Sequence, residues 1–296
     1  MSGLLKPALL FVLTVAVLAL PIVFWIGSAR EHPNQPVEVL KKYLTSVYAR
    51  DFHQAYKFIS AADRQLKTRH DYVRERGPFN GFAHEVARKL SGFMELRPVS
   101  RRIDGTKNRV TLALKLPDAN ALSDLLLEWD ERRLNTLPWS EQKKILSKLD
   151  DLAREDKLPT IEGEEEFTVV REGSQWKVFL DWAAGVQVKF DTRLPAGGVL
   201  AAQPTTRETV ARSGDLFTIG FKVKNNGAGD IVTRIAHRVE PEEMAQYLDL
   251  VECALLLPVR LQPGEEQIYK STYVVRGDLP DGTKSLDVTY EFKVEN

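Results

Sequence analysis

The hydrophobic pattern begins with nineteen residues without a charge, 8–26, which read ALLFVLTVAVLALPIVFWI. About 20 apolar residues cross the hydrocarbon core of a bilayer as a helix, so the run predicts a membrane segment. Two interpretations stay open: an uncleaved anchor over residues 1–29, favoured by the length of the run, and a signal peptide cleaved near Gly27-Ser28-Ala29. The slight positive-inside bias from Lys6 predicts a single-pass protein of the cell inner membrane, with the remaining chain in the periplasm.

Helical spacing follows this segment. A first helix is predicted behind Asn34-Gln35-Pro36, from apolar residues three or four positions apart: Val37, Leu40, Leu44 and Val47. A second short helix is expected after Asp51. The pairs Ser60–Asp63 and Thr68–Asp71 have capping-box spacing, which indicates two further helical turns.

The pattern then changes to alternation. Residues 93–99 and 110–116 flank Asp104-Gly105 and predict a hairpin, and residues 165–171 and 175–182 predict a second one. Between the hairpins, residues 119–156 return to helical spacing with a break at Pro138 and are interpreted as a helical insertion. Helices followed by an antiparallel sheet predict an α+β domain over residues 34–183.

From Gly185 onward helical periodicity nearly disappears, apart from a predicted helical turn at 241–247. Seven strand-like runs follow, at 186–190, 206–210, 216–224, 231–239, 248–261, 267–275 and 285–294. Short strands at this spacing are typical of an immunoglobulin-like sandwich, so residues 184–296 are predicted as an all-β second domain.

Charge balance and cysteine content exclude a class of partner and a class of covalent bond. Lysine plus arginine and aspartate plus glutamate number 41 each, and this balance argues against nucleic acid as a partner. The only cysteine, Cys253, stands in the apolar stretch VECALLLPVRLQPGEEQ, so no disulfide can form within the chain. An unpaired cysteine in such a strand most often behaves as a small buried hydrophobe.

The residues predict no catalytic site. His53, His70 and His84 lack metal-ligand spacing, and the acidic run 162–166 is interpreted as a solvated turn. In the second domain His237 is the single histidine, and no acid is placed by spacing to activate Cys253 as a nucleophile. The chain is therefore predicted not to be an enzyme.

The first domain resembles the cone-shaped fold of the nuclear-transport-factor-two and SnoaL superfamily over about residues 36–182. The resemblance rests on the rhythm of YLTSVYARDFHQAYKFIS near its start and REGSQWKVFLDW at its end. It implies a cone-like α+β domain that encloses a pocket, which some members of the superfamily use for isomerase chemistry.

Turns and strands in the second domain carry a closer resemblance. They are 188–191, 204–208, the long segment FKVKNNGAGDIVTRIAHRVEPEEMAQYLDLVEC, the turn 261–265 and the final strand 286–292. In this order the segments resemble the periplasmic part of the CtaG-type cytochrome c oxidase assembly family, which delivers copper to the binuclear centre of the oxidase. The resemblance implies a role in respiratory-chain biogenesis, with the oxidase subunit that carries the copper centre as partner.

The family's metal motif is Cys-x-Cys-Phe, in which two thiolates on one face of a strand hold Cu(I). Cys253 takes the position of the first cysteine, but Leu255 stands at the second and Leu256 at the aromatic position. A third cysteine that the family often carries near its membrane segment is also missing. Because the family forms dimers through this region, the resemblance leaves open a homodimer in which two copies of Cys253 share one copper ion, with Met244 as the nearby soft ligand.

The sequence therefore predicts a membrane-anchored accessory factor that faces the periplasm and acts in oxidase assembly as a scaffold or chaperone. Copper transfer is in doubt because Leu255 breaks the chelate. Two alternatives remain: a non-catalytic envelope binding module that uses the cone-domain pocket, and an enzyme of the cone fold.

Overall fold

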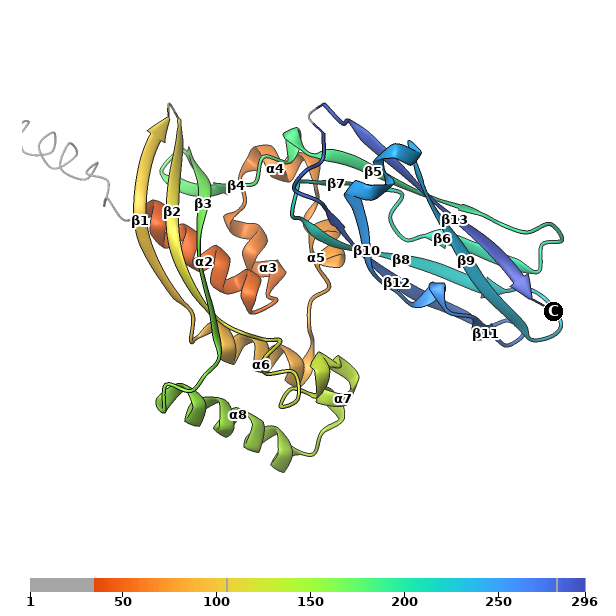
Figure 1. The fold of residues 1–296 in the computed structure, drawn as a ribbon, viewed down its shortest axis with the longest axis horizontal. Coiled ribbons are helices and arrows are strands. Elements are labelled where there is room, and N and C mark those ends of the chain that lie inside the picture. Colours follow the sequence, from red (N-terminus) through yellow and green to blue (C-terminus); the bar gives the residue numbers. More distant parts are fainter. Residues whose placement is uncertain (1–34, 105, 281, 296) are drawn as a thin grey trace, which may run out of the picture.

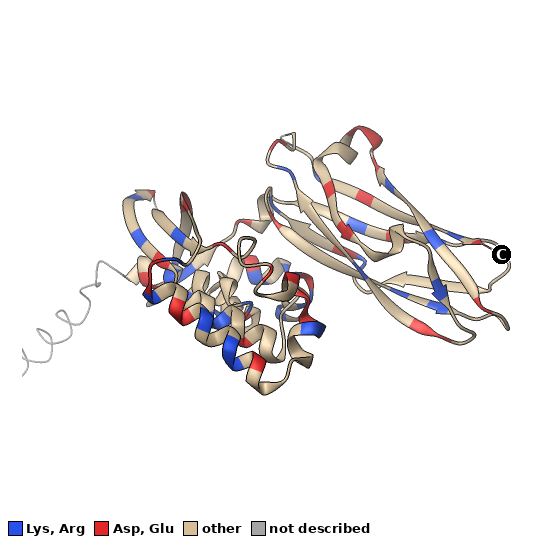
Figure 2. Ribbon diagram, turned by 60° about the horizontal axis from the view of Figure 1, so that its bottom comes forward, with Lys and Arg blue, Asp and Glu red and all other residues tan. Residues whose placement is uncertain are grey.

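The computed structural model describes residues 35–104, 106–280 and 282–295. The predicted membrane segment 8–26 lies outside these residues, and no helix within them is long and apolar enough to span a bilayer. The described chain has an α+β part with one antiparallel sheet and a β-rich part made of two sheets (Figure 1). Acidic and basic residues are interspersed over both parts (Figure 2).

The predicted helices are present, although Asn34, at the predicted start of the first, lies outside the described residues. They are α2 (Gln35–Tyr48), α3 (Phe52–Ala55) with the 3-10 turn η1 (Tyr56–Phe58), α4 (Ala61–Leu66) and α5 (Arg69–Arg76). The side chains of Asp51, Ser60 and Thr68 accept hydrogen bonds from the backbone N–H groups that begin α3, α4 and α5. The capping residues in the sequence therefore predicted the starts of these three helices correctly.

Helix α6 (Gly81–Ser91) was not predicted, although its apolar residues have helical spacing. Its capping position, Asn80, makes no side-chain cap bond. Instead Asn135, more than 50 positions later, accepts a hydrogen bond from the N–H of Ala83 at 3.0 Å. The start of α6 is thus fixed by a tertiary contact that no local motif reveals.

Both predicted hairpins are present and form one sheet in the order β1-β2-β3-β4. The strands are β1 (Glu95–Asp104), β2 (Lys107–Pro117), β3 (Thr160–Glu172) and β4 (Gln175–Phe179). Helix α2 lies against this sheet and α3 packs on α2 (Figure 1), and the helices and sheet bury a core that includes Leu40, Val110, Leu112, Val169 and Val178. The acidic run 162–166 lies exposed within β3 rather than in a turn, because it pairs with residues 111–115 of β2.

The helical insertion is only partly regular. Helices α7 (Glu131–Thr136) and α8 (Trp139–Arg154) flank Pro138, as predicted, and pack with α6 around a second core. The segment before them is a series of turns that ends in the 3-10 turn η2 (Leu127–Trp129), not the expected helix. All three residues of η2 have positive φ angles of 51–59°, which end any right-handed helix there.

The β-rich part is a sandwich of two sheets, in the orders β10-β12-β8-β6 and β11-β9-β13-β5-β7. Its strands are β5 (Val186–Arg193), β6 (Leu200–Pro204), β7 (Glu208–Ala211), β8 (Leu216–Asn225), β9 (Ile231–Glu240), β10 (Leu248–Cys253), β11 (Val259–Leu261), β12 (Glu266–Val275) and β13 (Ser285–Glu295). The strand β6 was missed, and the 3-10 turn η4 (Glu242–Tyr247) confirms the predicted helical turn.

The prediction of one strand over residues 248–261 was wrong. β10 ends at Cys253, the 3-10 turn η5 (Ala254–Leu256) follows, and β11 begins at Val259 in the other sheet. The chain crosses the sandwich at this point and inserts Leu255, which is 0% exposed, into the core. Strand pairing therefore ends at Cys253, and the turn that follows buries Leu255 in the core.

Candidate functional site

Cys253 lies at the end of β10, the edge strand of its sheet, and is paired with Ser271 of β12. Its side chain is half-buried and packs against the core of the sandwich. The predicted candidate residue therefore faces inward, as a small core residue does.

The thiol is bordered by hydroxyl groups. Ser271 Oγ donates a hydrogen bond to Cys253 Sγ at 3.2 Å, and the Tyr290 hydroxyl lies 3.7 Å from the same sulfur. The hydroxyls of Tyr290 and Tyr273 are 2.6 Å apart, and burial raises the pKa of both tyrosines. Cys253 thus belongs to a cluster of hydrogen-bonding groups, which we call the hydroxyl cluster: Cys253, Ser271, Tyr273 and Tyr290.

Sequence reasoning did not find the three hydroxyl partners. Alternation along β12 and β13 does place Ser271, Tyr273 and Tyr290 on buried positions. That these residues meet Cys253 follows only from the register of β10 against β12 and from the packing of the two sheets.

This donor set does not fit Cu(I) held by a single chain. Cu(I) prefers thiolate or thioether sulfur, whereas the polar partners recorded at Cys253 Sγ are hydroxyl oxygens. The expectation that residues 253 and 255 share one face of a strand was wrong, because the strand ends at Cys253. Across the described residues, no group of three or more His, Cys, Asp and Glu side chains is arranged to hold a metal ion.

Among the other soft or titratable candidates, His237 borders the hydroxyl cluster, with its ring centre 5.7 Å from that of Tyr273 and 5.5 Å from that of Tyr290. Met244, in η4, packs against the sandwich core. His237, on β9, pairs with Tyr290, and its Nε2 atom is buried without a hydrogen-bond partner in the part of the chain described. Burial lowers the pKa of His237, which favours the neutral imidazole. His53, His70 and His84 lie on α3, α5 and α6, respectively, and form no common site.

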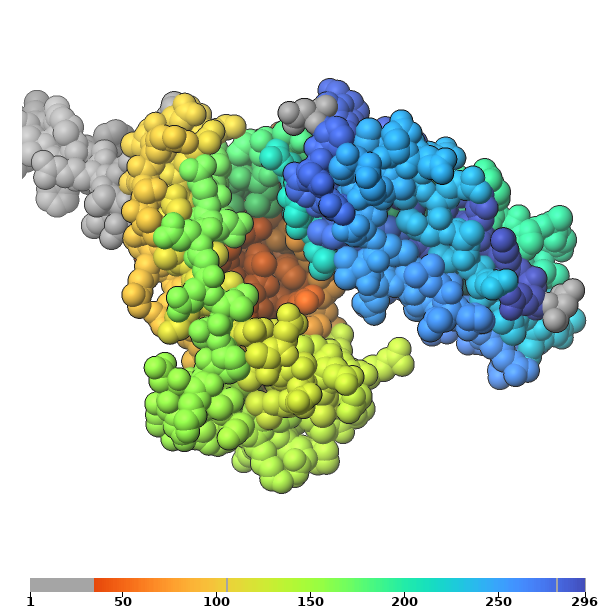
Figure 3. All heavy atoms as spheres, in the orientation of Figure 1, coloured from red at the N-terminus to blue at the C-terminus, as the bar shows by residue number. Residues whose placement is uncertain are grey.

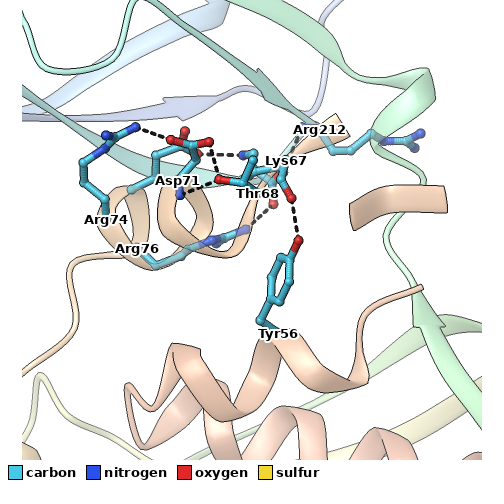
Figure 4. Close-up of polar contacts among 9 residues, drawn as sticks. Tyr56, Lys67, Thr68, Asp71, Arg74, Arg76 and Arg212 are labelled. Atoms are coloured by element: carbon cyan, nitrogen blue, oxygen red, sulfur yellow. Dashed lines mark hydrogen bonds and ion pairs between the residues drawn. The ribbon is translucent and has the colours of Figure 1, made fainter. Parts of the chain in front are cut away.

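Polar residues around α5 join the two parts of the molecule (Figure 4). We call this group the polar seam: Lys67, Glu75, Arg76, Arg212 and Asp215. Arg76 donates to Asp215, just before β8, at 2.9 Å, and Asp215 also accepts the backbone N–H of Arg212. Burial by itself would lower the pKa of Arg76. The charges of Asp215, Tyr72 and Tyr43 together have a larger, opposite effect, so the pKa of Arg76 is raised overall. A buried ion pair, Lys67–Glu75 at 2.7 Å, lies close by, with Lys67 Nζ 4.8 Å from the ring centre of Trp182.

A cavity of about 570 Å³ opens beside this seam. Its lining comes from the ends of α2 and α5, from α3 and α6, from the turns that lead to η2, and from Leu216 at the start of β8. No residue of the sheet β1–β4 lines it, so it is not the interior of the predicted cone. Sequence reasoning missed this cavity because widely separated segments build its walls.

Comparison with known proteins places the similarity in the second half of the chain. The model of the family "Cytochrome c oxidase assembly protein CtaG/Cox11" matches residues 160–293, from the start of β3 to near the end of β13. The family match does not include helices α2–α8 or the hairpin β1–β2, so the resemblance of the first domain to the cone-shaped superfamily stays a prediction.

Curated relatives match a little over a third of the chain. The protein "Cytochrome c oxidase assembly protein CtaG" of Sinorhizobium medicae is 26% identical over 112 residues, which is 36% of this chain and 57% of the relative. Its namesake from Nitrobacter hamburgensis is 24% identical over 115 residues, 37% of this chain and 53% of the relative. The chain therefore spans about half the length of the curated relatives it matches, and its residues 160–293 are similar to the CtaG/Cox11 family.

Proposed function

We propose that the protein is a membrane-anchored accessory factor of cytochrome c oxidase assembly that faces the periplasm and acts by holding a protein partner, not by transferring copper. In this proposal residues 1–29 form the anchor, residues 34–183 one domain and residues 184–296 the other. The oxidase subunit that carries the copper centre is the proposed partner.

The match of residues 160–293 to the oxidase assembly family supports the proposed role in oxidase assembly. The match covers β5 to β12 completely and β13 up to residue 293. It supports a role that depends on the sandwich as a whole.

The surroundings of Cys253 support holding rather than metal transfer. Its thiol accepts a hydrogen bond from buried Ser271, and the position of the second family cysteine is occupied by Leu255 in the core. A transfer site needs a thiolate that both a donor and an acceptor can reach, and an inward, hydrogen-bonded thiol at a sheet edge offers poor access. Holding a protein partner, by contrast, requires no metal ligand in this chain.

The test is complementation of a deletion strain. We expect loss of the chain to lower assembled cytochrome c oxidase, and we expect the wild type and Cys253→Ser to restore it equally. Serine keeps a small hydrogen-bonding group beside Ser271 but removes the only sulfur of the motif. Ala254→Ser, on the exposed neighbouring residue, serves as the matched control.

The readouts are oxidase activity and copper content of the purified oxidase. Normal oxidase in the deletion strain would reject the assembly role. Oxidase that lacks copper in the Cys253→Ser strain, but not in the Ala254→Ser strain, would show that the thiol delivers copper and would overturn the holding role.

A further inference from the structure

The cavity between the two parts of the molecule has the dimensions of a small-molecule site. Its volume of about 570 Å³ falls within the range of about 300–1,000 Å³ that is usual for ligand pockets. Figure 3 shows the hollow, with residues of the first helices at its floor and the sandwich along one side. Its lining spans both parts of the molecule, from Val47 to Leu216.

Most of the wall is apolar and partly aromatic. Phe79 and Trp129 stack with ring centres 5.8 Å apart and an angle of 18° between their planes. Val47, Phe52 and Leu216 complete the apolar surface, and Leu216 is 40% exposed although it is a large aliphatic residue. Such a wall accommodates the hydrocarbon or aromatic body of a ligand.

Arg50 brings a positive charge to this apolar wall. Its guanidinium lies 4.5 Å from the ring centre of Phe79, and its Nη1 atom donates two long hydrogen bonds, to the carbonyls of Arg76 and Gly77 at 3.4 and 3.3 Å. No ion pair joins Arg50 to a carboxylate within residues 35–104, 106–280 and 282–295, whereas Arg76 is paired with Asp215. The Nε and Nη2 donors of Arg50 are thus left for another acceptor, and a guanidinium presents them as a planar fork suited to a carboxylate.

The backbone conformation at Arg50 is one that normally selects glycine. Arg50 has a φ of 57° directly after α2, where its N–H bonds to Val47 O and the next N–H bonds to Ser46 O. These two bonds define a Schellman helix end, in which a left-handed glycine is usual. An arginine at this position is held in a strained conformation, and its side chain lies in the cavity wall.

Strained backbone is concentrated around the same cavity. Six described residues other than glycine have positive φ, and four of them are Arg50 and the three residues of η2. Glu128 and Trp129 of η2 line the cavity. The remaining two, Asp156 and Asp181, do not. Strain that gathers at one pocket is typical of functional sites.

We propose that this cavity binds a small amphiphilic monocarboxylate, with its carboxylate on Arg50 and its apolar body against Phe79, Trp129 and Leu216. The half-buried guanidinium of Arg50 has no ion-pair partner in contact in the described part of the chain, and the charge of Glu131 acts on it only at longer range. A ligand carboxylate would supply a direct partner, which a neutral ligand cannot. Glu128 lies at the rim, but its side chain is 81% exposed and paired with Arg133 at 3.9 Å. The preference for a single negative charge therefore rests on Arg50, because Arg76, the other arginine of the lining, is already paired with Asp215. The proposal is independent of the role in oxidase assembly.

The first test compares a charged ligand with its neutral isostere. We expect the full chain, held in lipid nanodiscs, to bind 4-phenylbutanoate in calorimetric titration and to bind 4-phenylbutanamide at least about 10-fold more weakly. Arg50→Gln should weaken binding of the carboxylate by at least about 10-fold. Arg132→Gln, which removes an exposed arginine of α7 outside the lining, should leave binding unchanged.

The second test compares glycine and alanine at position 50, directly after α2. It measures unfolding temperature as well as binding, so that loss of binding can be distinguished from misfolding. Because position 50 is left-handed, Arg50→Gly should have a higher unfolding temperature than Arg50→Ala, while neither variant binds the carboxylate. Asp156, with a φ of 53° and the same pair of backbone bonds after α8, provides the matched control. Asp156→Gly should likewise be more stable than Asp156→Ala, with both binding as the wild type does.

Three results would overturn the proposal. They are the absence of 4-phenylbutanoate binding to the wild type, equal binding of the acid and the amide, and unchanged binding by folded Arg50→Gln or Arg50→Gly.

Discussion

At the residue scale, Leu255 stands where the Cys-x-Cys pattern of the resembling family would place a second cysteine. Its side chain is buried in the core of the sandwich, within a 3-10 turn that carries the chain from one sheet to the other. A cysteine introduced there would not lie beside Cys253 on the face of a strand, because the strand ends at residue 253. Restoring the motif in sequence therefore does not restore it in space.

Leu255→Cys is expected to destabilise the protein without creating a tight Cu(I) site. Truncation of a fully buried leucine to alanine costs about 2–5 kcal/mol, and cysteine, which retains more volume, should cost roughly 1–3 kcal/mol. Urea unfolding gives the stability, and competition against a Cu(I) chelator gives the affinity. Leu256→Cys, at an exposed neighbour, is the control for an added thiol. A large gain in Cu(I) affinity in Leu255→Cys alone would contradict this account.

At the element scale, a buried ion pair fixes α5 against the end of α4. Lys67, directly after α4, is paired with Glu75 of α5, and the two side chains are only 5% and 3% exposed. Lys67 also lies over the ring of Trp182, near the junction with the sandwich. Removal of one partner leaves the other charge buried, whereas removal of both leaves an apolar contact.

Lys67→Met should lower the free energy of unfolding by about 3–5 kcal/mol, because Glu75 is left without its cation. The double variant Lys67→Met/Glu75→Leu should recover most of that loss. Lys144→Met, which breaks the exposed pair Lys144–Glu141 on α8, should change stability by less than about 0.5 kcal/mol. Denaturant unfolding measures all three, and a double variant no more stable than Lys67→Met would contradict the interpretation.

At the scale of the whole molecule, the pair Arg76–Asp215 couples the α+β part to the sandwich. Helix α5 contacts β8, and the pair is about four-fifths buried, so screening by solvent is limited. Val210 of β7 also packs against the core of the α+β part. These contacts predict that the described parts unfold together.

Arg76→Met should separate a single thermal transition into two, because Asp215 loses its cation and the contact between the parts weakens. Arg193→Met, which removes a largely exposed arginine paired with Glu291 inside the sandwich, should leave one transition. Differential scanning calorimetry makes the comparison. One transition with an unchanged midpoint in Arg76→Met would show that the pair does not couple the parts.

Local signals in the sequence determined much of the secondary structure. The capping residues Asp51, Ser60 and Thr68 predicted three helix starts, because a capping bond joins residues two or three positions apart. Alternation predicted both hairpins and most strands of the sandwich, because side chains in a strand alternate between faces. The lone thiol was likewise evident from the sequence alone, whereas its assignment to an interrupted metal motif stays a prediction.

Other features depend on residues that meet only in the folded chain. The start of α6 is capped by Asn135, the thiol is bordered by hydroxyls from β12 and β13, and the cavity takes its walls from segments as distant as Val47 and Leu216. Each is a long-range contact, set by the register of strands and the packing of the two parts. The sequence by itself therefore determined which elements form, through interactions between near neighbours. Only the tertiary structure decided that Leu255 enters the core and that Arg50 meets an apolar cavity, because both follow from packing between distant segments.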